Sequence, residues 1–445
     1  ITYYGDGSQL TGVESGVSDF VASGTIANGA TVIVNTDGTV SVVAETGSPN
    51  PSVGTPAVFE SATSENMAVV YDSTNDKVVI AYRDKGDSGQ PGTAVVGTVT
   101  GTDITFGTPV VFESGQSEYI TATYDSTNSK VIIAYQDNGD SNKGKAIVGT
   151  VSGTSISFGS AAVFESGQAS WISATYDSTN EKVVVAYRDG ANSNYGTAAV
   201  GTVSGTSISF GTPVVFYSGV VSFVGSTFDS NSGKVVIAYR DDSDSSHGKA
   251  RVGTVSGTSI SFGSAVEYNT GNTPYNELTF DSTNNKVILA YRDVSNSSYG
   301  TARVGTVSGS SISFGSESVF ESGESDYIRV NYDSANQKVI FSYVDVDNSG
   351  DGTVIVGTVS GTSFSFGTPV VFFTGYPTHF GAAYVGSNKI VNAYNDNTNN
   401  NYGKAVVVTS SSVSTNLTSE NYIGIAAEAI SNGATGKVTI FGGTN

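Results

Sequence analysis

Aromatic side chains that stand beside Asn, Asp and Ser are the residues of this sequence best suited to recognise a ligand. Sugar rings stack on aromatic faces while their hydroxyl groups bond to polar side chains, so this mixture favours carbohydrate. One recurring position carries Tyr119, Trp171, Phe223, Tyr275, Tyr327 and His379, and a second carries Tyr195, His247, Tyr299 and Tyr402. We predict ligand binding by Tyr119, Trp171, Tyr195, Tyr275, Tyr299, Tyr327 and Tyr402. The alternative is that these rings only pack inside the fold.

A short acidic segment is the candidate metal site. Residues 345–351 (Asp-Val-Asp-Asn-Ser-Gly-Asp) alternate oxygen ligands and include a Gly, as in the first half of a calcium loop. The bidentate Glu of such a loop is missing, because Val356 stands at the twelfth position. Asp345 and Asp347 are therefore candidate calcium ligands, and a plain polar hairpin is the alternative. We expect no other cofactor.

Signatures of catalysis are missing from the sequence. There is no Gly-x-Ser-x-Gly elbow, His-Glu-x-x-His motif or phosphate loop. The chain has no Cys and two His, which excludes disulfides, thiol catalysis and a His-rich metal centre. Carboxylates from separate repeats could pair for glycoside hydrolysis, but the sequence singles out no such pair. We predict a protein that is not an enzyme and has no catalytic residues.

The charge balance excludes several classes of partner. Asp and Glu number 40 against 20 Lys and Arg, a formal net charge of −20. Nucleic acid and anionic membrane surfaces attract clustered basic residues, so neither is an expected partner. No run of 18 apolar residues is present, and we expect no membrane insertion.

A repeat of about fifty residues organises the chain. Residues 71–75 (Tyr-Asp-Ser-Thr-Asn) return at 124–128 and 176–180, with variants that begin at positions 228, 280, 332 and 384. Each period predicts four strands, for example at 119–124, 130–135, 145–151 and 156–164, joined by polar turns. Val, Ile, Thr, Tyr and Phe dominate, which is the composition of β-structure. Four strands per period of this length are typical of a β-propeller blade.

The two ends of the repeat region predict how its last unit is completed. The seventh unit lacks its fourth strand, while residues 53–60 (Val-Gly-Thr-Pro-Ala-Val-Phe-Glu) match 106–113 (Phe-Gly-Thr-Pro-Val-Val-Phe-Glu). We therefore expect an all-β, seven-bladed propeller of four-stranded antiparallel blades, closed by an N-terminal strand. An open solenoid is the alternative, but it usually carries distinct capping repeats.

The expected domains follow from this closure. We predict an N-terminal β flank over 1–52, the propeller over 53–409 and a C-terminal β flank over 410–445. The flanks share an Asn-Gly-Ala-Thr segment and are expected to pair, or to dock on a neighbouring subunit.

Two residues recur in every unit and are interpreted as scaffold. A Tyr near the end of the second strand, such as Tyr187, is expected to pack between blades, and the Asp two residues later, Asp189, to cap the following loop. That loop varies from unit to unit, whereas the turns on the opposite side hardly change. Variable loops on a rigid scaffold are where binding tends to lie, so the variable face is the candidate binding face.

Both ends of the chain resemble proteins of one kind. Residues 3–13 (Tyr-Tyr-Gly-Asp-Gly-Ser-Gln-Leu-Thr-Gly-Val) are similar to a motif of tail-fibre and other virion proteins of marine bacteriophages, notably cyanophages, and 421–438 resemble another segment of such proteins. The resemblance implies an extracellular virion structural protein of host adhesion, a homo-oligomer through its flanks. Its partner would be a cell-surface glycan or another virion protein. A self-assembling filament subunit joined by strand addition and a polysaccharide-degrading propeller enzyme are the alternatives.

Overall fold

The computed structural model describes residues 16–43, 45–46, 51–410, 414–415 and 422–440. This part of the chain is built from antiparallel β-strands, with short 3-10 turns at Asn138–Asp140 and Val294–Asn296 and no α-helix. None of the described segments is a helix with the length and hydropathy that a bilayer crossing requires. The chain divides into two compact units, 50–411 and 1–49 with 412–445.

The larger unit repeats one pattern of strand pairing. The second half of β14 (Ala162–Asp177) pairs with β15 (Lys182–Asp189), which pairs with β16 (Tyr195–Ser204). β16 then pairs with β17 (Ser207–Phe210) and with the first half of β18 (Val214–Asp229). The outer strand of each sheet therefore has two pieces, and the long strand continues into the next sheet.

The same pattern runs along the whole unit. Its other strands are β5 (Ser52–Val53), β6 (Ala57–Asp72), β7 (Lys77–Asp84), β8 (Pro91–Thr100), β9 (Asp103–Phe106), β10 (Val110–Asp125), β11 (Lys130–Asp137), β12 (Lys143–Ser152), β13 (Ser155–Phe158), β19 (Lys234–Asp241), β20 (His247–Ser256), β21 (Ser259–Phe262), β22 (Val266–Asn269), β23 (Glu277–Asp281), β24 (Lys286–Asp293), β25 (Tyr299–Ser308), β26 (Ser311–Phe314), β27 (Ser318–Asp333), β28 (Lys338–Asp345), β29 (Asp351–Ser360), β30 (Ser363–Phe366), β31 (Val370–Phe373), β32 (Thr378–Tyr384), β33 (Lys389–Asp396) and β34 (Tyr402–Thr409).

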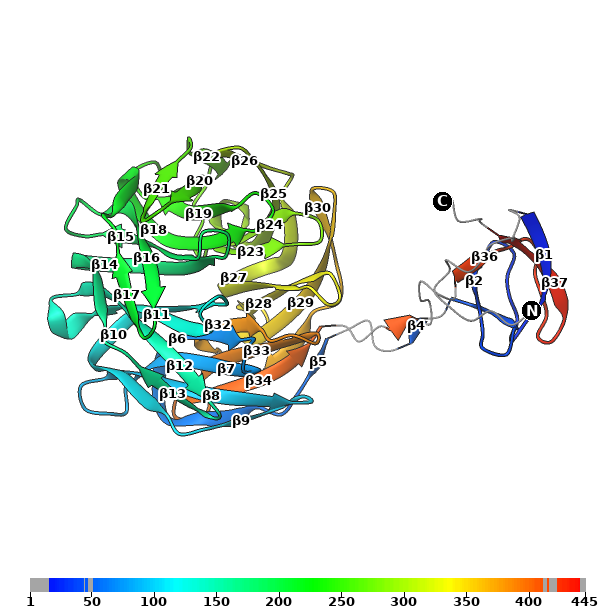
Figure 1. The fold of residues 1–445 in the computed structure, drawn as a ribbon, viewed down its shortest axis with the longest axis horizontal. Helices are drawn as coiled ribbons and strands as arrows, with labels where there is room; N and C mark the ends of the chain where they lie inside the picture. Colours follow the sequence, from blue (N-terminus) through cyan, green and yellow to red (C-terminus); the bar gives the residue numbers. More distant parts are fainter. Residues whose placement is uncertain (1–15, 44, 47–50, 411–413, 416–421, 441–445) are drawn as a thin grey trace. The chain divides into compact units, whose positions relative to one another are not determined.

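The first strands of this unit pair with its last strand. β34 pairs with β5 and with the first half of β6, while the second half of β6 pairs with β7. Figure 1 shows the blue β5 beside the orange β34. This is the pairing that the match between 53–60 and 106–113 predicts.

A buried Tyr connects each sheet to the one before it. Tyr187 of β15 is fully buried, and its hydroxyl donates to Glu165 Oε2 at 3.0 Å. Its ring lies 5.1 Å from that of Phe164. Glu165 and Phe164 lie in the first half of β14, which pairs with β12 of the preceding sheet. The same hydroxyl contact joins Tyr82 to Glu60, Tyr135 to Glu113 and Tyr343 to Glu321. The interpretation of this Tyr as packing between sheets is confirmed.

Buried aspartates hold the turns. Asp177 accepts hydrogen bonds from the backbone N–H groups of Thr179 and Asn180, each at 3.0 Å, before β15 begins. After β15, Asp189 accepts from the N–H groups of Ala191 at 3.1 Å and Asn192 at 3.0 Å. Asp favours such turns because its side chain bonds the backbone two or three residues on. The expected capping of the variable loop by Asp189 is confirmed.

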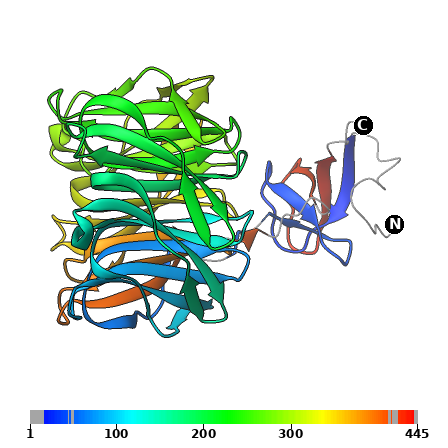
Figure 2. The same ribbon diagram turned by 60° about the vertical axis from the view of Figure 1, so that its left-hand side comes forward.

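The smaller unit is a five-stranded sheet made from both ends of the chain. Its order is β1 (Gly16–Val21), β37 (Thr435–Ile440), β36 (Tyr422–Ala426), β2 (Thr31–Val34) and β3 (Val40–Val42), and a two-stranded sheet joins β4 (Glu45–Thr46) to β35 (Ser414–Thr415). Figure 2 shows the blue and red strands side by side. The expected pairing of the flanks is therefore present. The motif at 3–13 lies outside the described residues, as does Asn421 of the second motif.

Candidate functional site: an aromatic-lined cavity

One position in each repeat has a left-handed backbone. This position lies within a β-bulge: between Ser170 and Ser173 the strand β14 contains one residue more than its partner β15. Trp171 in this bulge has φ of +50°. The equivalent residues are Asn66, Tyr119, Phe223, Tyr275, Tyr327 and His379, and all have φ between +48° and +60°. Bulky side chains rarely adopt this conformation, because Cβ then crowds the backbone carbonyl oxygen.

The six rings at this position contact one another in sequence. Trp171 and Phe223 are the closest pair, with ring centroids 4.2 Å apart. The other centroid distances are 5.5 Å for Tyr119–Trp171, 5.4 Å for Phe223–Tyr275, 5.4 Å for Tyr275–Tyr327 and 6.4 Å for Tyr327–His379. We call this row from Tyr119 to His379 the aromatic arc. Asn66 stands where a seventh ring would be.

The aromatic arc lines a cavity of about 410 Å³. Every member of the arc, together with Asn66, contributes to the lining. Apolar contacts come from Met67, which follows Asn66, and from Ile120, Ile172 and Val224, which directly follow members of the arc. The volume is within the range of small-molecule sites, which are mostly apolar with a few placed polar groups.

The charged groups of the cavity are gathered on one part of its wall. Arg329 Nη1 lies 3.1 Å from Glu277 Oε1, and both side chains are partly exposed to the cavity. Burial raises the pKa of Glu277, although the guanidinium of Arg329 opposes this shift. The other repeats carry Ala68, Thr121, Ser173, Gly225 and Gly381 at this position. The charged pair therefore breaks the repetition of the cavity wall.

Two arginines lie against rings of the arc. The guanidinium carbon of Arg240 lies 4.7 Å from the ring centroid of Phe223, and that of Arg292 lies 5.4 Å from Tyr275. Such contacts attract a cation to an aromatic face. Each arginine also has a carboxylate partner, since Arg240 pairs with Asp242 at 2.6 Å and Arg292 pairs with Asp326. These cations are therefore already neutralised.

His379 closes the arc next to a carboxylate. Its Nε2 lies 3.8 Å from Glu65 Oε1. Burial lowers the pKa of His379, although Glu65 opposes this shift. The lowered pKa favours the neutral form of the ring over the charged one.

The structure separates the predicted ligand-binding residues into two groups. Tyr119, Trp171, Tyr275 and Tyr327 lie together in the cavity. The remaining three, Tyr195, Tyr299 and Tyr402, begin β16, β25 and β34 and do not line it. Their role in binding stays a prediction.

Several lining residues were missed from the sequence, including polar ones. Asn66, Glu277 and Arg329 carry no aromatic ring, which was the feature that selected the candidates. Alignment of the repeats gives a usable signal for Glu277 and Arg329, because they are charged at a position where the other repeats carry a small residue.

Of the candidate calcium ligands, Asp345 ends β28 and Asp347 lies in the turn between β28 and β29. Asp345 accepts a hydrogen bond from Asn348 N at 3.1 Å, as in the other capped loops, and Asp347 Oδ2 accepts from Glu324 N at 3.3 Å. Burial and the neighbouring Glu321 raise the pKa of Asp345. These contacts describe a polar hairpin, and calcium binding there stays a prediction.

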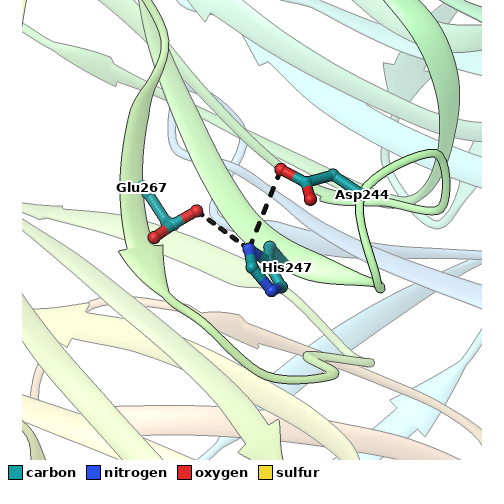
Figure 3. Close-up of side chains that lie close together, drawn as sticks. All are labelled: Asp244, His247 and Glu267. Carbon is teal, nitrogen blue, oxygen red and sulfur yellow. Dashed lines mark hydrogen bonds and ion pairs between the residues drawn. The ribbon is translucent and has the colours of Figure 1, made fainter.

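A different group brings three metal-binding side chain types together. Among the described residues, Asp244, His247 and Glu267 form the group whose ligand atoms lie within 4.8 Å of one another (Figure 3). His247 Nδ1 lies 2.9 Å from Glu267 Oε2 and 3.8 Å from Asp244 Oδ2. Lys249 Nζ pairs with the same Asp244 oxygen at 2.8 Å. An ammonium group therefore already neutralises one of the three ligands.

Comparisons with known proteins identify the fold alone. No protein-family model and no curated protein sequence matches this chain. Among solved structures, the chain is similar to the BP39L lectin from Burkholderia pseudomallei, with 9% identity, a TM-score of 0.59 and coverage of 81% of this chain and 99% of the lectin. A chain from the Mitotic Checkpoint Complex has 6% identity, a TM-score of 0.52 and coverage of 80% and 93%. The fold is therefore all-β, antiparallel and propeller-like.

Proposed function

We propose that this chain is a carbohydrate-binding protein without enzymatic activity, and that the aromatic-lined cavity is its glycan site. One observation carries the proposal, namely that six aromatic residues around one cavity have a left-handed backbone conformation. This conformation costs roughly 1–2 kcal/mol for an ordinary residue, whereas Gly and Asn tolerate it. Strain of this kind gathers at ligand sites, where the surrounding structure maintains it. Rings that only packed the interior would not need this backbone in six repeats.

We further propose that the larger unit is a seven-bladed propeller. The sequence period, the recurrent pairing of four strands and the pairing of β34 with β5 and β6 support a closed ring. In such a ring the strands that carry the aromatic arc are innermost. The arc would then surround the central channel.

The chemistry of the cavity supports binding over hydrolysis. Glycoside hydrolysis uses a pair of carboxylates, about 5–5.5 Å apart in retaining enzymes and 6.5–9.5 Å in inverting ones. Among the described residues that line the cavity, Glu277 is the only carboxylate. The name of the BP39L lectin also favours carbohydrate as the ligand class.

The biological setting we propose is the surface of a virion. The end motifs resemble those of phage tail-fibre proteins, and the flanks form a β-sheet unit of their own that could join copies of the chain. The propeller would then present its cavity to a cell-surface glycan during host adhesion. Electron microscopy of the native particles, with antibody against this chain, tests this placement.

A glycan array tests the binding function. We expect the wild-type protein to bind a limited set of glycans, and Trp171→Ala to lose that binding. Tyr299→Ala is the matched control, because Tyr299 lies outside the cavity and its loss should leave binding unchanged. Binding lost with Tyr299→Ala and kept with Trp171→Ala would place the site on the outer tyrosines, and no bound glycan at all would overturn the function.

A further inference from the structure

We infer that the Glu277–Arg329 pair orients the ligand and selects a neutral sugar with two adjacent hydroxyl groups. This inference rests on the proposed glycan site. It begins from the asymmetry of the wall, where one charged pair stands among the small residues of the other repeats. A sugar that stacks on the rings alone could rotate within their plane, and the pair provides the fixed polar contact that stops this.

The charges of the lining match a neutral ligand. Glu277 and Arg329 form an ion pair at 3.1 Å, and burial lowers the pKa of His379, which disfavours its charged form. The arginines behind Phe223 and Tyr275 are already paired with acidic side chains. An anionic or cationic ligand would therefore lose its hydration without meeting a free counter-charge.

The pair keeps hydrogen-bonding capacity for the ligand. Arg329 Nη1 contacts Glu277 Oε1 and donates to Ile328 O at 2.8 Å. Within the described part of the chain, Glu277 Oε2 and Arg329 Nη2 have no hydrogen-bond partner. One ligand hydroxyl can donate to the carboxylate while its neighbour accepts from the guanidinium. Two adjacent hydroxyls on a pyranose provide this donor and acceptor side by side.

The single tryptophan makes the inference measurable. Trp171 is the only Trp of the chain and lines the cavity, so its fluorescence reports occupancy directly. Titrations at pH 7 should use methyl glycosides of neutral hexoses, their deoxy analogues that lack one of two adjacent hydroxyls, and the corresponding uronic acid. We expect a neutral glycoside to bind at least tenfold more tightly than its deoxy analogue and than the uronic acid.

Variants then assign the selection to the pair. Glu277→Gln and Arg329→Gln should each weaken binding of the neutral glycoside about tenfold and reduce the discrimination against the deoxy analogue. Arg329→Lys keeps the charge but not the planar fork of donors, and should recover only part of the affinity. Lys143→Gln is the control, since Lys143 forms an ion pair with Asp140 that lies outside the cavity.

The outcomes separate the two proposals. If wild type binds glycosides and Trp171→Ala does not, while both Gln variants bind like wild type, the inference fails and the glycan site stands. A preference for the uronic acid also overturns the inference alone. If no glycoside changes Trp171 fluorescence or releases heat in calorimetry, and the array is negative, both proposals fall. Thermal unfolding of each variant shows whether it remains folded.

Discussion

The indole of Trp171 and the phenyl ring of Phe223 lie 4.2 Å apart between centroids, and both residues have a left-handed backbone. Phe223 also contacts the guanidinium of Arg240 at 4.7 Å, and the ring of Tyr119 lies 5.5 Å from the indole. The indole is thus held between neighbours before any ligand arrives, so that little conformational entropy remains to be lost on binding.

Removal of Phe223 should release this indole. We expect Phe223→Ala to shift Trp171 emission to longer wavelength and to increase its quenching by iodide, because one face of the indole becomes exposed to water. Tyr299→Ala, outside the cavity, should change neither. Unchanged quenching in Phe223→Ala would show that the indole is not held by this contact.

The left-handed backbone of the arc residues predicts that they tolerate substitution by Asn unusually well. Tyr119→Asn should change the free energy of unfolding by less than about 1 kcal/mol, because relief of roughly 1–2 kcal/mol of backbone strain offsets the lost ring contacts. Asn66 already occupies the equivalent place with φ of +51°. Urea denaturation measures the change. Tyr135→Asn, at a fully buried core position, should lose about 3 kcal/mol or more, and an equal loss at Tyr119 would contradict the strain argument.

The hydroxyls between sheets provide a matched pair of Tyr→Phe changes. Tyr187→Phe removes the 3.0 Å bond to Glu165 and should destabilise the protein by about 1–2 kcal/mol. Tyr394 is equally buried, but among the described residues its hydroxyl has no partner, because Phe373 occupies the place of Glu165. Tyr394→Phe should therefore be neutral or stabilising in thermal or urea unfolding. A similar loss of stability in both variants would show that it comes from altered packing and not from the lost hydrogen bond.

The carboxylate of Glu60 predicts a pH-dependent stability. Burial and the nearby Asp84 raise the pKa of Glu60 above its usual 4.5. The Glu60 carboxyl group therefore stays protonated to a higher pH in the folded protein than in the unfolded chain. Its protonation stabilises the folded state at low pH, and this stabilisation is lost as pH rises through the folded pKa. We expect Glu60→Gln to be more stable than wild type at pH 7, with the difference shrinking as pH falls through the folded pKa of Glu60 and gone below about pH 4.5.

A second repeat provides the control for that experiment. Glu113 occupies the equivalent position, but Lys145 Nζ lies 4.0 Å from its Oε2. Glu113→Gln loses this attraction, so it should bring no gain at pH 7. A gain of equal size in both variants would show that removal of negative charge alone explains the effect.

The calcium hypothesis predicts a simple titration result. If Asp345 and Asp347 bind calcium, its addition raises Tm, a chelator reverses the rise, and Asp347→Asn abolishes it. Equal Tm with calcium and with chelator would leave the loop as a plain polar hairpin.

Local chemistry and the period were readable from the sequence. The turn around Asp177 and the contact of Tyr187 with the preceding sheet follow from residues that recur at fixed spacing, each with one physical role. The aromatic arc could be anticipated because an aromatic residue recurs with the period at the position of Trp171.

Which side chains line the cavity depended on a detail of backbone geometry that the sequence does not show. One extra residue in each bulge decides which side chains face the cavity, and no residue type marks it. For this reason Tyr195 was grouped with Trp171, although only Trp171 lines the cavity, and Glu277 and Arg329 were not recognised as partners.

The pairing of β5 with β34 also sets the order of events during synthesis. Ser52 Oγ and Thr409 Oγ1 lie 2.6 Å apart although 357 positions separate them in the chain. On the ribosome, the first strand must wait for nearly the whole larger unit to emerge, with an unpaired edge that can associate with other chains. Joining such distant segments also slows folding. Chaperone dependence and yield in expression should therefore respond more to changes near residue 409 than to equal changes in the middle sheets.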